Sequence, residues 1–377
     1  MLSFRDYHTL QILESYSQSN LPLDALLRNY LRLHKAIGSK DRNAIAQKIY
    51  FIIRNLSLID HQISHPVTWE KRILFMNSYE PKNNSSLPLH IQYSCPKWLF
   101  ELLKLQYNEL VLEQILKVSN TEAPLTIRVN TLKTTPEDLE AELKKEFTLN
   151  KCSSSPLGFK FTKREPVTSH PLFKQGYFEI QDEASQMAIL KLDITPGQHI
   201  LDYCAGAGGK SLAAAPLLHN KGLLYLHDIR SHAIKEAQKR FLRAGIHNAQ
   251  FFDPIKPLPG NLKQKMDWII LDVPCSGTGT LRRNPDLKWK ITPESLSRLI
   301  KEQQKIFDEA LYYLKPGGKV VYSTCSILEM ENKHQIEFFL EKYPSLKKLD
   351  ELILLPEENS HDGFYSCILW LDDKRPK

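Results

Sequence analysis

The chain has 377 residues, of which 42% are apolar and 25% are charged. This composition excludes a mainly disordered chain, a collagen-like repeat and a small disulfide-rich protein. Lys and Arg number 50 against 43 Asp and Glu, so the net charge of +7 permits a polyanionic partner without indicating one. The six cysteines leave two possibilities open: three disulfides, or reduced thiols that take part in chemistry.

The sequence contains no sign of export or membrane insertion. The N-terminal stretch MLSFRDYHTL lacks the apolar core of a signal peptide. No run of about 18 apolar residues, the length that a membrane span requires, occurs in the sequence. We therefore expect a cytoplasmic protein, a compartment in which free thiols are ordinary.

Residues 1–78 are predicted to be helical. Apolar residues recur at three- and four-residue spacing over residues 41–60, and a similar pattern covers residues 23–33. Residues 28–54 carry seven Lys and Arg against a single acidic residue. Such a run is usually a solvated helix face, but it favours phosphate contacts if the rest of the chain handles nucleic acid.

Residues 79–190 are predicted to form a linker followed by a small α+β module. The segment EPKNNSSLPL, residues 80–89, is rich in Pro, Asn and Ser, as linkers are. Helices and alternating strands follow it. The expected helices cover residues 98–118 and 136–146, and the expected strands cover residues 125–133 and 176–181.

Residues 191–377 are predicted to form an α/β domain, because strands and helices alternate regularly there. The main predicted strands are HILDYC, LLYLHD, QFFD, DWIILDV and KVVYSTC. Such alternation indicates a parallel sheet that helices cover on both faces. Sheets of this kind bind ligands beyond the carboxyl ends of their strands, and each motif described below falls at such an end.

A glycine-rich turn joins the first of these strands to a helix in LDYCAGAGGKS, residues 201–211. It fails as a P-loop because Cys204 stands where the first glycine is required. It also fails as a dinucleotide fingerprint, because Ser211 replaces the third glycine. The tight turn and acidic residues on three successive strands suit S-adenosylmethionine, which needs space beside the backbone and acidic partners for its ribose. These acidic residues are Asp202, Asp228 and Asp253.

Two cysteines stand at the ends of two further strands. LDVPCSGTG places Asp272 and Cys275 at one strand end, and VVYSTCS places Cys325 at the next. A lone cysteine is most often a small buried hydrophobe, but two thiols at one sheet edge favour chemistry. A thiolate that adds to carbon-6 of a pyrimidine makes carbon-5 nucleophilic enough to attack a methyl sulfonium. An acid near N3 and a base for the carbon-5 proton complete that reaction.

In these motifs the chain resembles the RsmB/Sun-type RNA (cytosine-5) methyltransferases. The resemblance rests on DYCAGAGGK, DVPCSGTGTLRRNPDLKW and YSTCSILEMEN in this order, with RVNTLK and GYFEIQDEASQ upstream. It implies a Rossmann-like S-adenosylmethionine-dependent methyltransferase domain over residues 191–377, preceded by an RRM-like α+β module within 79–190 and a NusB-like helical RNA-binding domain over 1–78. The glycine loop departs from the family, which commonly has Cys-Ala-Ala-Pro-Gly-Gly-Lys where this chain has Gly206 and Ala207.

The resemblance also implies roles for individual residues. Cys325 is the expected nucleophile, Cys275 the second cysteine that acts in product release, and Asp272 a contact to the base or cofactor. DNA cytosine methyltransferases lack the Thr-Cys-Ser motif, so its presence here favours RNA. The expected cofactor-binding residues are Cys204, Ala205, Gly206, Ala207, Gly208, Gly209, Lys210, Asp228, Asp253 and Asp272.

The segment LRRNPDLKWK, residues 281–290, interleaves basic residues with a tryptophan directly after the Pro-Cys turn. Such a composition suits phosphate contact and base stacking, and the target cytosine must leave any stack to reach a thiol. Two residues of RVNTLK are candidates for the same groove, although structural capping is equally consistent with them. The expected RNA-binding residues are Arg128, Asn130, Arg282, Arg283, Lys288 and Trp289.

We therefore expect an RNA cytosine-5 methyltransferase that uses S-adenosylmethionine and, as the resemblance implies, acts on small-subunit rRNA. The alternatives are a tRNA cytosine-5 methyltransferase and an rRNA-binding ribosome-assembly factor whose catalysis is dispensable. We expect a monomer without a metal ion. Because disulfides would consume the catalytic thiols, we expect reduced cysteines, with only packing roles for Cys95, Cys152 and Cys367.

Overall fold

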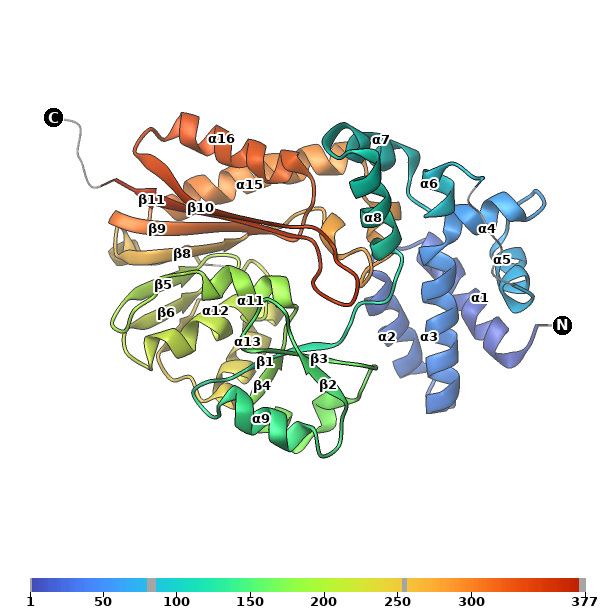
Figure 1. Ribbon diagram of the computed structural model, residues 1–377, viewed down its shortest axis with the longest axis horizontal. Coiled ribbons are helices and arrows are strands. Elements are labelled where there is room, and N and C mark those ends of the chain that lie inside the picture. Colours follow the sequence, from blue (N-terminus) through green and yellow to red (C-terminus); the bar gives the residue numbers. More distant parts are fainter. Residues whose placement is uncertain (1, 80–85, 253–255, 373–377) are drawn as a thin grey trace. The chain divides into compact units, whose positions relative to one another are not determined.

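The computed structural model describes residues 2–79, 86–252 and 256–372 (Figure 1). The chain divides into two compact units, Met1–Glu122 with Thr280–Pro293, and Ala123–Gly279 with Glu294–Lys377. This division differs from the three predicted domains. The helical unit continues into the predicted α+β module, and it takes in a segment from the middle of the predicted methyltransferase domain.

Helices build the first unit over the residues that the structure describes. They are α1 (Phe4–Ser17), α2 (Leu23–Leu33), α3 (Ser39–Arg54), α4 (Leu56–Gln62), α5 (Trp69–Asn77), α6 (Leu89–Gln92), α7 (Lys97–Gln106), α8 (Glu109–Ser119) and α14 (Leu287–Lys290). The predicted apolar stripe of α3 is confirmed, because Ile45, Ile49 and Ile52 are fully buried against Ile12 of α1. Most of the predicted linker, residues 80–85, lies outside the described residues.

A four-stranded antiparallel sheet with the order β2-β3-β1-β4 opens the second unit. Its strands are β1 (Thr126–Val129), β2 (Leu149–Lys151), β3 (Gly158–Phe161) and β4 (Phe178–Ile180), with α9 (Pro136–Leu143), η1 (Val167–Ser169) and α10 (Pro171–Lys174) between them. Leu139 and Leu143 of α9 pack on Phe159 and Phe178 of the sheet. The sequence predicted β1 and β4 but not β2 and β3, which are short and carry lysines.

A seven-stranded sheet with the order β10-β11-β9-β8-β5-β6-β7 forms the rest of the second unit. The strands are β5 (His199–Asp202), β6 (Leu223–Leu226), β7 (Ala249–Phe251), β8 (Met266–Asp272), β9 (Leu314–Thr324), β10 (Leu346–Leu354) and β11 (Phe364–Leu371). The predicted parallel sheet is confirmed for β5 to β9, and the hairpin of β10 and β11 adds to it in antiparallel fashion.

Helices cover both faces of this sheet (Figure 1). One face carries α11 (Glu183–Leu190), α12 (Gly209–Ala214), η2 (Ala215–Leu218) and α13 (Ser231–Ala244), and the other carries α15 (Pro293–Leu311) and α16 (Lys333–Lys342). Successive residues of β8 alternate between the two cores: Trp268 packs toward the first layer and Ile269 toward the second. A strand buried on both faces needs a continuous apolar run, which explains the sequence WIIL.

The order of the strands fixes where a ligand can bind. From β5 the chain builds outward through β6 and β7, then returns to place β8 and β9 on the other side of β5. The carboxyl ends of β5 and β8 therefore border the point where the strand order reverses, which is where such sheets bind ligands. Within the described ranges, no helix is both long enough and apolar enough to cross a membrane.

Candidate active site

The two cysteines that were predicted to act in catalysis lie in contact. Cys275 follows β8 and Cys325 follows β9, and these strands are parallel neighbours with Asp272 opposite Ser323. The two Sγ atoms are 3.3 Å apart, well beyond the ~2.05 Å of a disulfide bond. Each of the six cysteines is a free thiol.

The environment of Cys275 keeps its thiol protonated. The hydrogen bond with Cys325, followed by burial, raises the pKa of Cys275 well above its ordinary value. At neutral pH Cys275 is therefore an S–H group that can donate to the neighbouring sulfur. Burial likewise raises the pKa of Cys204 in the glycine loop well above its ordinary value, so this thiol is a poor nucleophile.

A buried carboxylate holds the Pro-Cys turn. Glu331, in the short helix η5 (Glu329–Glu331), is fully buried. Its Oε1 accepts hydrogen bonds from the backbone N–H of Ser276 at 2.8 Å and from Nε2 of Gln303 at 2.9 Å. Its Oε2 accepts a hydrogen bond from the Ser276 hydroxyl. The turn that carries Cys275 is therefore fixed at the residue directly after the thiol.

Further hydrogen bonds hold the Thr-Cys-Ser turn. The hydroxyl of Thr324 donates to Oδ1 of Asn332 at 2.5 Å, and Nδ2 of Asn332 donates to the Ser326 carbonyl at 2.9 Å. The backbone N–H of Gly279 donates to the Cys325 carbonyl at 2.9 Å. Hydroxyl groups join the two turns, because Oγ of Ser326 lies 3.1 Å from Oγ of Ser276.

Sequence reasoning missed these polar partners. Ser276, Glu331 and Asn332 all stand inside the quoted motifs DVPCSGTG and YSTCSILEMEN. The sequence offers a signal for Ser276 alone, a polar residue soon after a strand that is buried on both faces, whereas Glu331 and Asn332 come later, at the end of η5 and directly after it. Such residues need hydrogen-bond partners when they are buried, and each turn supplies partners to the other.

The glycine loop after β5 is shaped by left-handed backbone. Gly206 has φ +54° and Gly208 has φ +78°, values that glycine adopts without the strain of a Cβ atom. This conformation accounts for Gly206 at a position where the family commonly has alanine. A Cβ at Gly208 would lie 2.9 Å from the ring of Phe241, whereas a Cβ at Gly209 would meet no described atom within 4 Å. The loop therefore packs against α13 on one side and is open at Gly209.

Asp228, which follows β6 after His227, binds the glycine loop. Its Oδ2 accepts from the N–H of Gly206 at 2.8 Å and from Nη2 of Arg230 at 2.9 Å, and its Oδ1 accepts from the backbone N–H and Nε of Arg230. Although burial raises the pKa of Asp228, these hydrogen bonds outweigh it and lower the pKa below its ordinary value. Arg230, two positions beyond Asp228, was not predicted from the sequence.

Two further carboxylates lie at the same sheet edge. Asp202 is fully buried; its Oδ2 accepts from the Ser211 hydroxyl at 2.6 Å, and its Oδ1 has no hydrogen-bond partner among the described residues. Burial raises the pKa of Asp202 to about 7. Asp272 pairs with Nζ of Lys210 at 2.6 Å and keeps 40% of its side chain exposed. The ring of Phe364 lies 5.0 Å from the same Nζ atom.

These residues fit an S-adenosyl cofactor. The ends of β5 and β6 bring together a loop open at Gly209, the ionised Asp228 and an oxygen of Asp202 without a hydrogen-bond partner among the described residues. Asp253, the predicted residue after β7, lies outside the described residues. Among the described residues, no group of His, Cys, Asp or Glu is arranged to hold a metal ion.

The small sheet buries two of the predicted RNA contacts. Arg128 is 2% exposed and donates from Nε to Oε1 of Gln181 at 2.7 Å. Asn130 is 3% exposed and donates from Nδ2 to the carbonyls of Gly176 at 2.8 Å and Ala244 at 2.9 Å. Of the two interpretations left open by the sequence, structural capping is the one that the contacts of these residues support.

The first unit buries most of the predicted basic segment. Lys288 is 3% exposed and donates to the Arg54 carbonyl at 2.8 Å and to Oδ1 of Asn120 at 3.0 Å. Trp289 donates from Nε1 to the Ile53 carbonyl at 2.8 Å. Arg282 is 2% exposed. This burial does not fit direct contact of Arg282 or Lys288 with RNA, and these residues instead attach the segment to the helices; Arg283 is half-buried.

Taken together, the doubly wound sheet, the glycine loop after β5 and the carboxylate after β6 define the class of S-adenosylmethionine-dependent methyltransferases. The profile of the family described as 16S rRNA methyltransferase RsmB/F matches residues 189–370. The profile described as the RsmF/B-like ferredoxin-like domain matches residues 95–168.

Known proteins that are similar to this chain support the same family. The probable ribosomal RNA small subunit methyltransferase B of Synechocystis is 30% identical over 303 residues, covering 75% of this chain and 68% of its own length. The ribosomal RNA small subunit methyltransferase B of Photorhabdus laumondii is 31% identical over 293 residues, covering 75% and 67%. The crystal structure of a methyltransferase homologue from Pyrococcus horikoshii has a TM-score of 0.67 and 28% identity, covering 77% of this chain and 99% of that one. The chain belongs to the RsmB/F family of 16S rRNA methyltransferases.

Proposed function

We propose that this protein transfers a methyl group from S-adenosylmethionine to carbon-5 of a cytosine in small-subunit rRNA. The observation that carries the proposal is the contact between the Cys275 and Cys325 sulfurs, 3.3 Å apart at the ends of adjacent strands. The names of the relatives, which are small-subunit rRNA methyltransferases, support the choice of RNA. When bound, the cofactor supplies the methyl group as part of a reactive sulfonium.

The two thiols have different roles in the proposed reaction. As a thiolate, Cys325 would attack carbon-6 of the cytosine, which breaks the double bond between carbon-5 and carbon-6 and leaves the electron pair on carbon-5, where the methyl group that the cofactor supplies would be accepted. The Cys275 S–H group donates to the Cys325 sulfur. Once Cys325 is bonded to carbon, its sulfur is a neutral thioether and a weaker acceptor, so the hydrogen bond that contributes most to the raised pKa of Cys275 is weakened. Cys275 can then release its proton to water and accept the carbon-5 proton, after which the Cys325–carbon bond breaks and the ring double bond re-forms.

Replacement of each thiol tests this mechanism. We expect Cys325→Ala to lose methyl transfer from labelled cofactor while it still binds S-adenosylmethionine in calorimetry. We expect Cys275→Ala to accumulate a protein–RNA adduct that survives denaturing electrophoresis, because the covalent intermediate cannot be resolved. Cys152→Ala, a thiol in the small sheet region, is the control and should transfer normally. Undiminished transfer by Cys325→Ala would contradict the proposal.

The same assay separates the alternative functions. Transfer to tRNA but not to 16S rRNA fragments would favour a tRNA methyltransferase. Cofactor-independent binding of rRNA without any transfer would favour an assembly factor. Bisulfite sequencing of total RNA with and without the protein reports the modified base and RNA class together. We also propose that the protein acts as a monomer in the reducing cytosol, since its mechanism requires free thiols.

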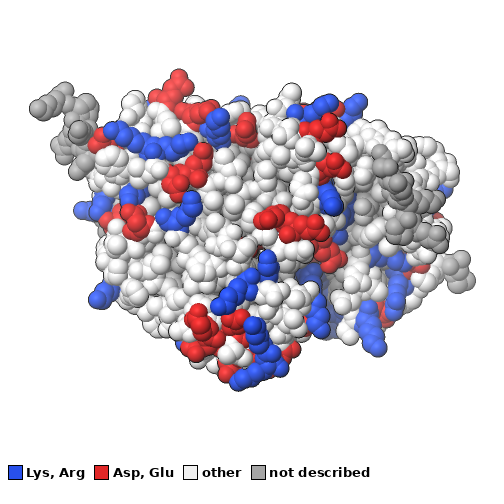
Figure 2. Space-filling model, in the orientation of Figure 1, with Lys and Arg blue, Asp and Glu red and all other residues white. Residues whose placement is uncertain are grey.

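Exposed basic residues of the first unit support RNA binding there. Arg28 and Arg32 on α2, and Lys35 and Lys40 after it, are exposed. Figure 2 shows that on the face in view, over the described residues, basic and acidic side chains are intermixed. The logarithm of RNA affinity falls with the logarithm of salt by about 0.7–0.9 per phosphate contact. We expect Arg32→Gln with Lys35→Gln to lower that slope by up to about two such contacts, whereas the exposed Lys239→Gln on α13 should leave it unchanged.

A further inference from the structure

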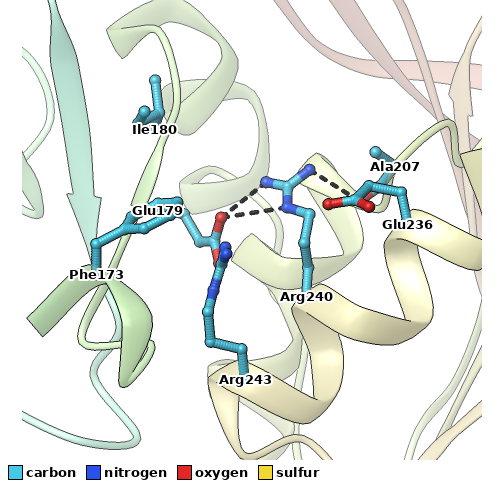
Figure 3. Close-up of a pocket in the computed structure, with 7 residues that line it drawn as sticks. All are labelled: Phe173, Glu179, Ile180, Ala207, Glu236, Arg240 and Arg243. Atoms are coloured by element: carbon cyan, nitrogen blue, oxygen red, sulfur yellow. Dashed lines mark hydrogen bonds and ion pairs between the residues drawn. The ribbon is translucent and has the colours of Figure 1, made fainter. Parts of the chain in front are cut away.

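An ion-pair cluster links the small sheet to α13 in the second unit (Figure 3). Glu179 of β4 is 3% exposed. Its Oε2 accepts from Nη2 of Arg240 at 2.9 Å and from Nε at 3.2 Å, and its Oε1 accepts from Nη2 of Arg243 at 2.5 Å. The two arginines, both on α13, therefore share one buried carboxylate.

Only one of these two arginines reaches the glycine loop. Nη1 of Arg240 donates to the Ala207 carbonyl at 2.8 Å (Figure 3). Arg243 instead lies over the ring of Phe173, with its guanidinium carbon 4.1 Å from the ring centre. Two hydrogen bonds to Glu179 fix the orientation of the planar Arg240 guanidinium, and in that orientation its Nη1 points at the Ala207 carbonyl of the loop.

The carbonyl that Arg240 binds lies between two glycines of the loop. The Ala207–Gly208 peptide lies next to Gly206 and Gly208, both in left-handed backbone. Glycine rotates between backbone conformations at little cost, so this peptide plane needs external restraint to keep one orientation. The N–H of Gly208 donates to the Ala205 carbonyl at 2.8 Å, and Arg240 holds the opposite end of the same peptide.

The surroundings favour a positioning role over a ligand site. A cavity of about 250 Å³ lies along the cluster. Two arginines and two glutamates, Glu179 and Glu236, contribute to its lining, so its charges balance and it offers no excess charge to an ionic ligand. Gln181, also from the β4 region, donates to the Gly209 carbonyl at 3.3 Å and so contacts the loop at a second carbonyl.

We propose that Arg240, oriented by Glu179, is a positioning residue that fixes the glycine loop for S-adenosylmethionine. The inference rests on the proposed function and adds a residue outside the sequence motifs to its cofactor site. Arg240 bonds the small sheet to the cofactor loop at the Ala207 carbonyl, and loss of this contact releases the Ala207–Gly208 peptide from that orientation. A role limited to attaching α13 to the small sheet would stabilise the fold without changing cofactor affinity.

The two arginines form a matched pair for the test. Arg240→Met and Arg243→Met each remove one cation and one ion pair with Glu179, but only the first removes the bond to Ala207. Calorimetry should show S-adenosylmethionine binding weakened about tenfold by Arg240→Met, the loss expected for one charged hydrogen bond, and by less than about twofold for Arg243→Met. The KM for the cofactor should rise with kcat nearly unchanged, and both variants should lose similar thermal stability.

Three outcomes overturn or support the proposal. Unchanged cofactor affinity in Arg240→Met, or equal weakening in both variants, would show that the cluster only stabilises the fold. If Arg240→Met does not fold, Arg240→Lys keeps the charge but not the forked geometry, and weakened binding by that variant supports the proposal. A wild-type chain that binds the cofactor but methylates no RNA would contradict the proposed function and leave this comparison of affinities intact.

Discussion

Replacement of Glu331 by alanine tests whether the buried network positions the thiols. The Glu331 carboxylate accepts two hydrogen bonds from Ser276 and one from Gln303. After truncation, Gln303 still donates to the Pro274 carbonyl at 3.0 Å, but the Ser276 N–H loses its acceptor. An unsatisfied buried donor costs about 1–3 kcal/mol, and the cavity left by the side chain adds to it. We expect Glu331→Ala to lower the free energy of unfolding by about 2–4 kcal/mol.

Glu331→Gln sharpens the test because it keeps the volume of the side chain. Its amide oxygen can accept from the Ser276 N–H, and its amide N–H can donate to the Ser276 hydroxyl, whose proton then turns toward Ser326, 3.1 Å away. We therefore expect a loss below about 1.5 kcal/mol. Urea denaturation measures both losses, and single-turnover transfer should slow at least about tenfold in Glu331→Ala, since about 1.4 kcal/mol in a barrier is tenfold in rate.

A neighbouring glutamate provides the control. Glu329 belongs to the same short helix, but 44% of its side chain is exposed, so Glu329→Ala should change neither stability nor rate appreciably. Wild-type stability and rate in Glu331→Ala would refute the reasoning. An equal loss in Glu331→Gln and Glu331→Ala would also refute it, because the negative charge rather than the hydrogen-bond geometry would then be decisive.

Two further predictions concern Asp202 and Gly279. Burial raises the pKa of Asp202 to about 7, so the folded state binds the carboxyl proton more tightly than the unfolded state does. The resulting contribution of Asp202 to the free energy of unfolding is fully present below about pH 4 and is lost as the pH rises through about 7. As the pH rises across this range, the free energy of unfolding of Asp202→Asn, measured by urea denaturation, should increase by about 4 kcal/mol relative to that of the wild type. A difference between the two proteins that does not vary with pH would contradict this prediction. A Cβ at Gly279 would lie 2.2 Å from the Gly363 carbonyl, and the Gly279 N–H binds the Cys325 carbonyl, so the backbone there must shift. Gly279→Ala should therefore slow methyl transfer at least about tenfold while cofactor affinity stays the same, and an unchanged rate would exclude this account.

The thiol pair was predictable because its placement follows from strand topology. Cys275 and Cys325 each follow a continuous apolar run, and neighbouring parallel strands end at the same edge of the sheet. Glu331 was not predictable in this way, since its bond to Ser276 spans 55 residues and depends on how a short helix returns to the turn. Arg240 gave even less signal, because an arginine on an amphipathic helix is ordinarily a solvated residue.

The basic segment after the Pro-Cys turn shows why a charge pattern alone misleads. Helix α3 ends at Arg54, and the last carbonyls of a helix lack partners within it and carry partial negative charge. Lys288 and Trp289 donate to the carbonyls of Arg54 and Ile53, so these residues cap α3 from a distant part of the chain.

Asp286, from the same segment, caps the other kind of helix end, the N-terminus of α2. Its Oδ2 accepts from the backbone N–H of Leu23 at 3.0 Å, at the N-terminus of α2, where a helix carries partial positive charge. Donors that suit RNA phosphates also suit carbonyl oxygens, because both acceptors are electron-rich oxygen atoms. Composition therefore cannot distinguish the two uses, and only burial does. Burial lowers the pKa of Lys288 to about 7, because it disfavours the charged ammonium group. A lysine that contacts a phosphate at the solvent-exposed surface would not lose its hydration in this way.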